Sequence, residues 1–521
     1  MLNLALIYHM HQPYYQNLLT HEVSLPWVRL HGTKDYRDMV EILRKYPGIR
    51  LVFNLVPSLI EQIKAYTDSS VKEKFLEISR KQAEKLTSAE KEFLLNNFFM
   101  INKERVIAMH PRYYELYFKK QEGGEFNAQD LRDLQAWFNL AWTDPYFREN
   151  IPELKSLTRK ARFFTEDEKN TILDKQLEIL RGIIPVYKEF MDKGQIEITV
   201  SPYYHPILPL LYNTDIAKEA NLKARLPKHN FAYPEDARAQ IKEAVRLYSL
   251  NFSSAPAGMW PSEEAVSEHI IPLLIQEGIQ WIVADEAILF KSMKNKKRDT
   301  RVLYQPHRIK RKDGELKVVF RDRNLSDLIG FNYYNRDAKD AVEDMLRHFR
   351  DIYEAFKGQD PLVTIAMDGE NAWEYYENDG HKFLGLLYER IQEADFIKTT
   401  TVTDYLKSYP SRHEIKRLAA GSWIYADFFK WIGSPQKNKA WEYLSDARKE
   451  LESVMNNPKK LPEETLELAK KQLYIAEGSD WFWWYDEGQK DFDELFRLHL
   501  SNFYKIIGKE APIYLKAPIS A

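Results

Sequence analysis

Short runs of apolar and β-branched residues recur along the first four hundred residues, and amphipathic helical patterns separate many of them. Runs that are apolar throughout, with helices between them, indicate a parallel sheet that is covered on both faces. Because the chain has 521 residues, a closed or nearly closed β/α barrel is favoured over an open doubly wound sheet. We expect strands at residues 4–8, 50–54, 196–201, 281–284, 317–320, 362–367 and 399–402.

Two parts of the chain lack strand signals and predict helical additions to the barrel. Residues from about 69 to 175 are rich in Lys, Glu, Leu and Phe at helical spacing, which predicts a helical insertion. Further along, residues 437–456 and 462–476 are helical in pattern, which predicts a C-terminal helical domain over 411–521. The expected organisation is therefore a barrel domain over 1–410 that carries the insertion, followed by the helical domain.

The charge balance and the missing cysteines exclude several classes of function. Lys and Arg number 75 and Asp and Glu 77, so the net charge of −2 offers no general field for nucleic acid or an anionic membrane. There is no Cys, which excludes disulfides, thiolate metal sites and a Cys nucleophile. No Gly-x-Gly-x-x-Gly or P-loop pattern follows a predicted strand, which counts against nucleotide binding. Aromatic residues make up 13% of the chain, which leaves rings for flat apolar ligand faces.

The beginning of the chain predicts a strand rather than a targeting segment. Residues Met1–Tyr8 are apolar but lack a basic leader and a small-residue cleavage site. No window holds 18 uninterrupted apolar residues, so a membrane span is not expected. We expect a cytoplasmic protein without nucleic-acid or membrane partners, and a charged fraction of 29% without cysteine is compatible with a thermophile. The sequence carries no signal for the oligomeric state.

Residues that can carry chemistry follow three of the predicted strands and also occupy a loop between them. In β/α barrels the catalytic groups lie at the C-terminal ends of the strands, so we expect these segments to meet in one pocket. The segments are His9-Met-His11, Ser201-Pro-Tyr-Tyr-His205, Trp260-Pro-Ser-Glu263 and Asp368-Gly-Glu370.

Glu263 and Asp368 are the best pair for hydrolysing a glycosidic bond. Two carboxylates from different strands can act as a nucleophile and as a general acid and then base. The nucleophile must stay ionised, which nearby donors such as His11 or His205 favour. Asp368 has Glu370 close by and an apolar strand behind it, which raises the pKa of a carboxyl and suits the acid. Indole rings at Trp260 and Trp373 beside these carboxylates favour a sugar site over solvated loop charges.

A metal site is the alternative from another class of protein. His9-x-His11 after a first strand resembles the opening of metal-dependent amidohydrolases, and His205 with Asp368 would complete the ligands of a hydrolase or deacetylase. Gln12 stands where a further carboxylate is expected, and the prolines that follow His11 and His205 favour rigid loops that present single histidines to hydroxyls. The favoured site therefore holds no metal and no cofactor.

Five segments, in order along nearly the whole chain, resemble the signature regions of glycoside hydrolase family 57. They are His11-Gln-Pro13, Tyr203-Tyr-His-Pro-Ile207, Gly258-Met-Trp-Pro-Ser-Glu263, Asp368-Gly-Glu-Asn-Ala-Trp373 and Gly478-Ser-Asp-Trp-Phe-Trp-Trp484. The resemblance implies an incomplete (β/α)7 barrel with a C-terminal helical domain, and double displacement without a metal.

The same resemblance assigns roles to individual residues. It implies that Glu263 is the nucleophile and Asp368 the acid/base. Glu264 is a departure, because an uncharged residue is expected there, and it leaves open which of the two glutamates attacks. Asp486 stands where glycine is expected. We expect substrate contacts from His11, His205, Trp260, Trp373, Glu370, Trp423, Asp480 and Trp481. Trp423, Asp480 and Trp481 belong to aromatic segments of the C-terminal domain. The alternative for these segments is that they pack on the barrel.

The expected substrate is an α-glucan or a maltooligosaccharide. The nucleophile region lies late in the chain, after a long helical insertion, which is most similar to the α-amylase and amylopullulanase branch of the family. This implies a retaining hydrolase of α-1,4 bonds and of α-1,6 bonds as a second activity. A 4-α-glucanotransferase on the same scaffold is an alternative, because only the acceptor of the glycosyl group differs. A glucan-binding protein without catalysis is another.

Overall fold

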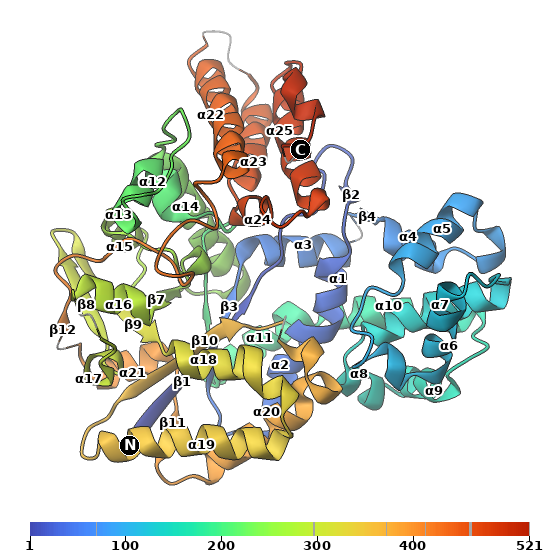
Figure 1. Cartoon of the computed structure of the whole chain (residues 1–521), viewed down its shortest axis with the longest axis horizontal. Coiled ribbons are helices and arrows are strands. Elements are labelled where there is room, and N and C mark those ends of the chain that lie inside the picture. Colours follow the sequence, from blue (N-terminus) through green and yellow to red (C-terminus); the bar gives the residue numbers. More distant parts are fainter. Residues whose placement is uncertain (69, 295–296, 371, 412, 458–460, 520–521) are drawn as a thin grey trace.

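The fold is built around a nearly closed barrel of seven parallel strands, as the sequence predicts. The structure is a computed structural model that describes residues 1–68, 70–294, 297–370, 372–411, 413–457 and 461–519 (Figure 1). The barrel strands, in chain order, are β1 (Leu2–Met10), β3 (Leu51–Leu55), β5 (Ile196–Thr199), β6 (Gly258–Met259), β7 (Trp281–Asp285), β9 (Gly314–Arg321) and β10 (Leu362–Asp368).

Backbone pairing is uneven around the barrel. β1 and β10 pair over seven residues, from Asn3 with Leu362 to His9 with Asp368. In contrast, β9 and β10 share the single pair Thr364 with Arg321, and an isolated bridge between Val200 and Met259 joins β5 to β6. These two short contacts explain why the barrel is nearly closed rather than complete, since a long ladder of hydrogen bonds is missing at both places.

The observed strands depart from the predicted ones in two places. The run at 399–402 is not a barrel strand: β11 (Ile397–Thr399) pairs with the beginning of β1, and helix α21 (Val402–Ser408) starts where a strand was expected. The seventh barrel strand is β6, whose two residues are too few to show any periodicity. A further pair, β8 (His307–Arg311) with β12 (His413–Glu414), extends the sheet beyond β9.

Helices between consecutive strands cover the outside of the barrel. Among the described residues no helix is both long and apolar enough to cross a bilayer. The longer covering helices are α3 (Pro57–Thr67), α11 (Ile183–Asp192), α14 (Pro234–Phe252), α15 (Ile271–Gln276), α16 (Glu286–Ser292), α19 (Ala338–Ala355) and α20 (His381–Glu393).

A group of helices between β3 and β5 stands to one side of the barrel (Figure 1). These helices pack around their own hydrophobic cluster, in which Trp137, Phe138 and Trp142 are buried. Residue 69, where the insertion is predicted to begin, lies outside the described residues, and the short strand β4 (Lys72–Glu73) was not expected. The helices are α4 (Lys74–Arg80), α5 (Ser88–Asn97), α6 (Pro111–Gln121), α7 (Ala128–Ala141), α8 (Pro145–Asn150), α9 (Pro152–Lys160) and α10 (Glu166–Arg181).

The last helices of the chain lie above the barrel in Figure 1. They are α22 (Pro435–Met455), α23 (Glu463–Ala476), α24 (Ser479–Trp483) and α25 (Lys490–Ile506). Segment 478–485, predicted as a loop, contains the short helix α24, and a bridge between Pro206 and Gly478 joins its start to the barrel. The division into domains at residue 411 stays a prediction.

Gly258 provides a test of the packing at β6. A Cβ added to Gly258 would overlap the indole ring of Trp281, and that ring is held because its Nε1 donates to Glu197 and Thr403, at 3.1 Å each. Gly258→Ala is therefore expected to lower the free energy of unfolding by about 1–3 kcal/mol, as overpacking of a core does. Chemical denaturation measures the change. Gly330→Ala is the control, because no atom lies within 4 Å of the added carbon there, and an equal loss in both variants would contradict the expectation.

Candidate active site

Adjacent strands place the first and fourth signature segments side by side. His9 is the register partner of Asp368, and the backbone N–H of Gly369 donates to the His9 carbonyl at 2.8 Å. Beyond them, the backbone N–H of His11 donates to Glu370 Oε1 at 3.3 Å. The two loops at this end of the barrel are thus joined by hydrogen bonds although about 360 residues separate them in the sequence.

The third signature segment, which carries Glu263, has a rare backbone conformation at the site. Glu263 and Glu264 both have positive φ, 58° and 49°, which non-glycine residues seldom adopt and which is common at functional sites. The turn directs the two side chains into different surroundings. Glu263 is half-buried, and Trp423 donates to it twice, from Nε1 to Oε2 at 2.8 Å and from the backbone N–H to the carbonyl oxygen at 3.1 Å.

Glu264 is fully buried, and neither of its carboxyl oxygens has a hydrogen-bond partner among the described residues. Burial raises the pKa of Glu264 well above its usual value, and Asp285 raises it further, although Arg321 opposes the shift. Of the two adjacent glutamates, Glu263 is the one that reaches the solvent-accessible side of the turn. This geometry favours Glu263 over Glu264 as the reacting carboxylate.

The charges of Glu263 and Asp368 are coupled. Burial, followed by the charge of Asp368, raises the pKa of Glu263 to about 8, while the hydrogen bond from Trp423 and the charge of Lys430 lower it. Asp368 is the last residue of β10 and is partly exposed. The protonation of Glu263 therefore depends on the charge of Asp368.

The rings of His9, His11, His205 and Trp260 stack on one another within the site. Ring centroids are 4.0 Å apart for His11 and His205, 5.0 Å for His9 and His205, and 4.8 Å for His9 and Trp260. Burial lowers the pKa of His9 to about 3 and that of His205 well below its usual value, so both rings are neutral. Asn54 fixes His9 through a contact of 2.6 Å between Asn54 Oδ1 and His9 Nδ1.

The segment around α24 supplies partners to two of these rings. His11 Nε2 lies 2.8 Å from Asp480 Oδ1, and His205 Nδ1 lies 3.0 Å from Ser479 Oγ. Within the described part of the chain, the other ring nitrogens, His11 Nδ1 and His205 Nε2, are buried without a hydrogen-bond partner. A buried nitrogen without a partner is costly, so these two nitrogens call for a hydrogen bond that the protein itself does not supply.

The residues predicted for a metal site are only partly brought together. One ligand atom from each of His11, His205 and Asp480 lies within 4.8 Å of the others. In this group Asp480 stands where Asp368 was expected, and His9 is not a member. This donor set fits a metal ion by its chemistry, although its carboxylate comes from α24 rather than from a barrel strand.

Several predicted binding residues lie behind the site rather than on its surface. Trp373 and Trp481 are each 1% exposed, and their indole nitrogens donate to the carbonyls of Gly369 and Ile475 at 2.8 Å. Glu370 is 3% exposed, and burial, then the charge of Asp368, raises its pKa well above its usual value. These side chains support the loops that carry Asp368 and Asp480. Their contact with a ligand stays a prediction, and their burial argues against it.

Three residues at the site were not predicted. Asn54 ends a predicted strand, and the rule that placed the other candidates at strand ends would also have found it. Arg321 ends β9, and its guanidinium lies 5.2 Å from the centroid of the Trp423 ring. Ser479, which contacts His205, has no comparable signal in the sequence, because helix α24 was not expected.

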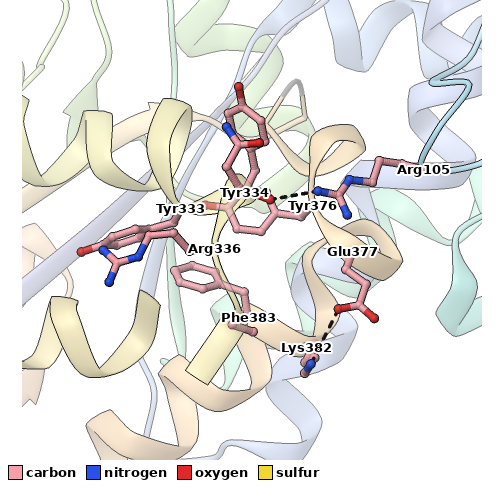
Figure 2. Close-up of a pocket in the computed structure, with 10 residues that line it drawn as sticks. Arg105, Tyr333, Tyr334, Arg336, Tyr376, Glu377, Lys382 and Phe383 are labelled. Atoms are coloured by element: carbon pink, nitrogen blue, oxygen red, sulfur yellow. Dashed lines mark hydrogen bonds and ion pairs between the residues drawn. The ribbon is translucent and has the colours of Figure 1, made fainter. Parts of the chain in front are cut away.

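A separate cavity of about 220 Å³ lies where the insertion meets the loop after β10 (Figure 2). Its lining includes Tyr333, Tyr376 and Phe383, and Arg105 Nη2 donates to the carbonyl of Tyr334 at 3.1 Å. None of the residues that line it belongs to the predicted site, so we assign it no part in the chemistry.

Glu264 yields a prediction about stability. A carboxyl whose pKa is raised by folding binds its proton more tightly in the folded state, so the folded protein loses stability as pH rises above the ordinary carboxyl pKa of about 4.3. Glu264→Gln removes this loss and is expected to raise Tm at pH 7–8 while leaving it unchanged near pH 4. Scanning calorimetry across this range measures the effect, and Glu354→Gln, on the exposed side of α19, is the control. A lower Tm for Glu264→Gln at pH 8 would show that an ionised Glu264 stabilises the fold.

Curated relatives match parts of the chain at low identity. An alpha-amylase of Dictyoglomus thermophilum is 24% identical over 267 residues, which cover 50% of this chain and 33% of the relative. A 4-alpha-glucanotransferase of Thermococcus litoralis is 24% identical over 306 residues, or 56% of this chain and 38% of the relative. A 1,4-alpha-glucan branching enzyme of Thermococcus kodakarensis is 21% identical over 464 residues, or 72% and 65%. The chain thus spans less than two thirds of the length of these relatives.

Solved structures agree with the fold over nearly the whole chain. The Thermococcus branching enzyme superposes with a TM-score of 0.62 at 17% identity, covering 97% of this chain and 90% of that one. The alpha-amylase AmyC of Thermotoga maritima gives a TM-score of 0.59 at 14% identity, with 97% and 93% covered. The model of the family described as glycosyl hydrolase family 57 matches residues 5–418, which include Glu263 and Asp368. With most of its length matched in this way, the chain belongs to glycosyl hydrolase family 57.

Proposed function

We propose that this protein is a retaining α-glucan hydrolase that cleaves α-1,4 bonds and, as a second activity, α-1,6 bonds. The observation that carries the proposal is the electrostatic coupling of Glu263 to Asp368, with the Trp423 indole donating to Glu263. Membership of the family supports an α-glucan or maltooligosaccharide as the substrate. The barrel over 1–410 is then the catalytic unit, and the segments after it supply Trp423 and Asp480 to the site.

In this proposal the two carboxyl groups act in two successive steps. Glu263 attacks the anomeric carbon while Asp368 gives its proton to the departing glycosidic oxygen, which leaves a glycosyl-enzyme. Asp368 then takes a proton from water, which attacks the same carbon and releases Glu263. The indole hydrogen bond favours the ionised form of Glu263, and the first step requires the proton of the pair to lie on Asp368.

The histidines hold the sugar without a charge of their own. Neutral His205 and His9 avoid competing with the oxocarbenium-like charge that develops on the sugar ring. The orphaned nitrogens of His11 and His205 bind sugar hydroxyls, and the Trp423 ring packs on the edge of the glucose unit. Asp480 keeps His11 in place through the contact at Nε2.

Product analysis tests the activity. The purified chain is incubated with maltooligosaccharides, amylose and pullulan, and the products are separated by chromatography. We expect shorter maltooligosaccharides together with a rise in reducing ends, since each hydrolysis creates one. Longer and shorter oligosaccharides without new reducing ends would instead identify a 4-α-glucanotransferase, and an unchanged mixture with measurable binding would identify a glucan-binding protein.

A metal-dependent hydrolase or deacetylase is the second candidate, and the grouping of His11, His205 and Asp480 favours it. A metal ion held by these residues would polarise a carbonyl or activate water for attack. Acetate release from acetylated chitooligosaccharides, with and without added Zn²⁺, tests this candidate. Acetate formation that depends on Zn²⁺ and is lost in Asp480→Asn would replace the leading proposal; none is expected.

Substitution of the adjacent glutamates tests which one attacks. Glu263→Gln is expected to abolish turnover of maltooligosaccharides, because an amide cannot form the glycosyl-enzyme. Asp368→Asn is expected to lower kcat by roughly 10²–10⁴-fold, the contribution of a general acid. Glu264→Gln serves as the matched control and should keep its circular dichroism spectrum and its ability to form the glycosyl-enzyme. Full activity of Glu263→Gln beside an inactive Glu264→Gln would reverse the assignment.

Trp423→Phe tests the protonation of the Glu263–Asp368 pair through the pH dependence of kcat/KM. Activity requires one proton on the pair, so kcat/KM falls at high pH as the raised pKa, about 8 in Glu263, is passed. Because the indole hydrogen bond lowers this pKa, Trp423→Phe should move the alkaline limb of the profile to higher pH while lowering kcat. The pH profile of kcat/KM is the measurement, and Trp484→Phe, whose ring packs on Phe492 away from Glu263, is the control. A limb that stays in place would show that Trp423 does not set the charge of Glu263.

A further inference from the structure

A second cluster of ligating side chains lies outside the carboxylate site. Asp38 begins α2 (Asp38–Glu41), Asp144 caps the N-terminus of α8 in the insertion, and His381 is the first residue of α20. One ligand atom from each residue lies within 4.8 Å of the others. Three segments that are far apart in the sequence therefore meet at this point, one of them from the helices beside the barrel.

One carboxyl oxygen in this cluster has no partner. Asp38 is 5% exposed, and its Oδ1 is buried without a hydrogen bond to any described residue. Asp144 is fully buried, and its Oδ1 accepts from the backbone N–H of Tyr146 at 2.7 Å. Both oxygens of Asp144 lie 2.9 Å from His381 Nε2. Since a buried acceptor without a partner is costly, Asp38 Oδ1 calls for a ligand that donates or carries positive charge.

The surroundings carry a surplus of negative charge. Asp35 and Asp379 lie close by, and Lys34 pairs with both of them. Burial, then the charges of Asp144, Asp35 and Asp379, raises the pKa of Asp38 well above its usual value. The nearby Asp379 has its pKa raised to about 7 by burial and the same carboxylates. Such a cluster is stable when it takes up either protons or a cation.

The donor set selects the kind of cation. Two carboxylates with one imidazole are ligands of Zn²⁺ and similar transition metals, whereas Ca²⁺ and Mg²⁺ prefer oxygen ligands alone. Bonds of about 2.0–2.2 Å in a tetrahedral site place the ligand atoms roughly 3.4 Å apart. A separation of at most 4.8 Å is closed by a small rotation of the side chains.

A cavity lies close to the cluster in the fold. A cavity of about 600 Å³ between the insertion and the loop after β10 is lined by Lys34, Pro145, Arg148 and Asp379, which flank the cluster in sequence. The side chain of His381 is 17% exposed. His381 is thus the point at which a cation and a water ligand would reach the cluster.

We propose that Asp38, Asp144 and His381 bind one divalent transition-metal ion of the Zn²⁺ type, which fastens the helical insertion to the barrel. The ion takes the place of the contact between His381 Nε2 and the carboxyl group of Asp144. The proposed ion stabilises the fold and takes no part in catalysis. The proposal does not depend on the roles of Glu263 and Asp368.

Metal content and titration test the proposal. Untagged protein is treated with a chelator, dialysed and titrated with Zn²⁺ alone, with calorimetry and elemental analysis as readouts. We expect one Zn²⁺ per chain at this cluster, a higher Tm, and binding at least roughly tenfold weaker in both Asp38→Asn and His381→Gln. Asp480→Asn is the matched control, because it disrupts the other possible ligand group and should retain this ion.

Hydrogen exchange locates the ion without any substitution, which covers the case in which a variant fails to fold. Zn²⁺ should slow amide exchange in α8 and α20 of the wild-type chain. The proposal is overturned if the wild type binds no stoichiometric Zn²⁺, which would leave a buried proton in the cluster. It is equally overturned if the bound ion is lost in Asp480→Asn alone, or if protection appears in α24 instead of α8 and α20.

Discussion

The parallel pairing of β1 with β10 is the constraint on which the site depends. Its register sets His9 beside Asp368, and the hydrogen bonds that continue past the strand ends attach His11 to Glu370. β3 pairs on the other side of β1 and brings Asn54 to His9. A shift of one residue in this ladder would turn every side chain to the opposite face of the sheet, so the register of the pair also fixes where Asp368 lies.

Burial shifts the pKa of several ionisable groups of the site, and at Glu263 it opposes the ionised state that a nucleophile needs. It keeps His9 and His205 neutral and raises the pKa of Glu263, which Trp423 then moderates through one hydrogen bond. The same low-dielectric surroundings raise the pKa of Glu264, which has no hydrogen-bond partner among the described residues. The charge state of the site thus depends less on the number of ionisable residues than on which of them accept a hydrogen bond from the protein.

Much of the fold was predictable because six barrel strands are continuous apolar runs, which a buried parallel sheet requires. The two-residue strand β6 was not, since no periodicity fits in so short a segment. At the site, the candidates at strand ends were found by topology, but the choice between Glu263 and Glu264 needed their different burial. The burial of Trp373 and Trp481 also escaped prediction, because a sequence does not show which face of an indole is covered. Residue 371, in the fourth signature segment, lies outside the described residues.

The contacts of Ser479 with His205 and of Asp480 with His11 have a consequence for how the molecule comes into being. Synthesis proceeds from the N-terminus, and early segments fold while later ones are still being made. Both carboxyls of the pair are on the nascent chain more than a hundred residues before α24. A ribosome-bound chain that already has its barrel therefore still lacks the partners of His11 and His205, so the complete centre forms only after α24 has been synthesised.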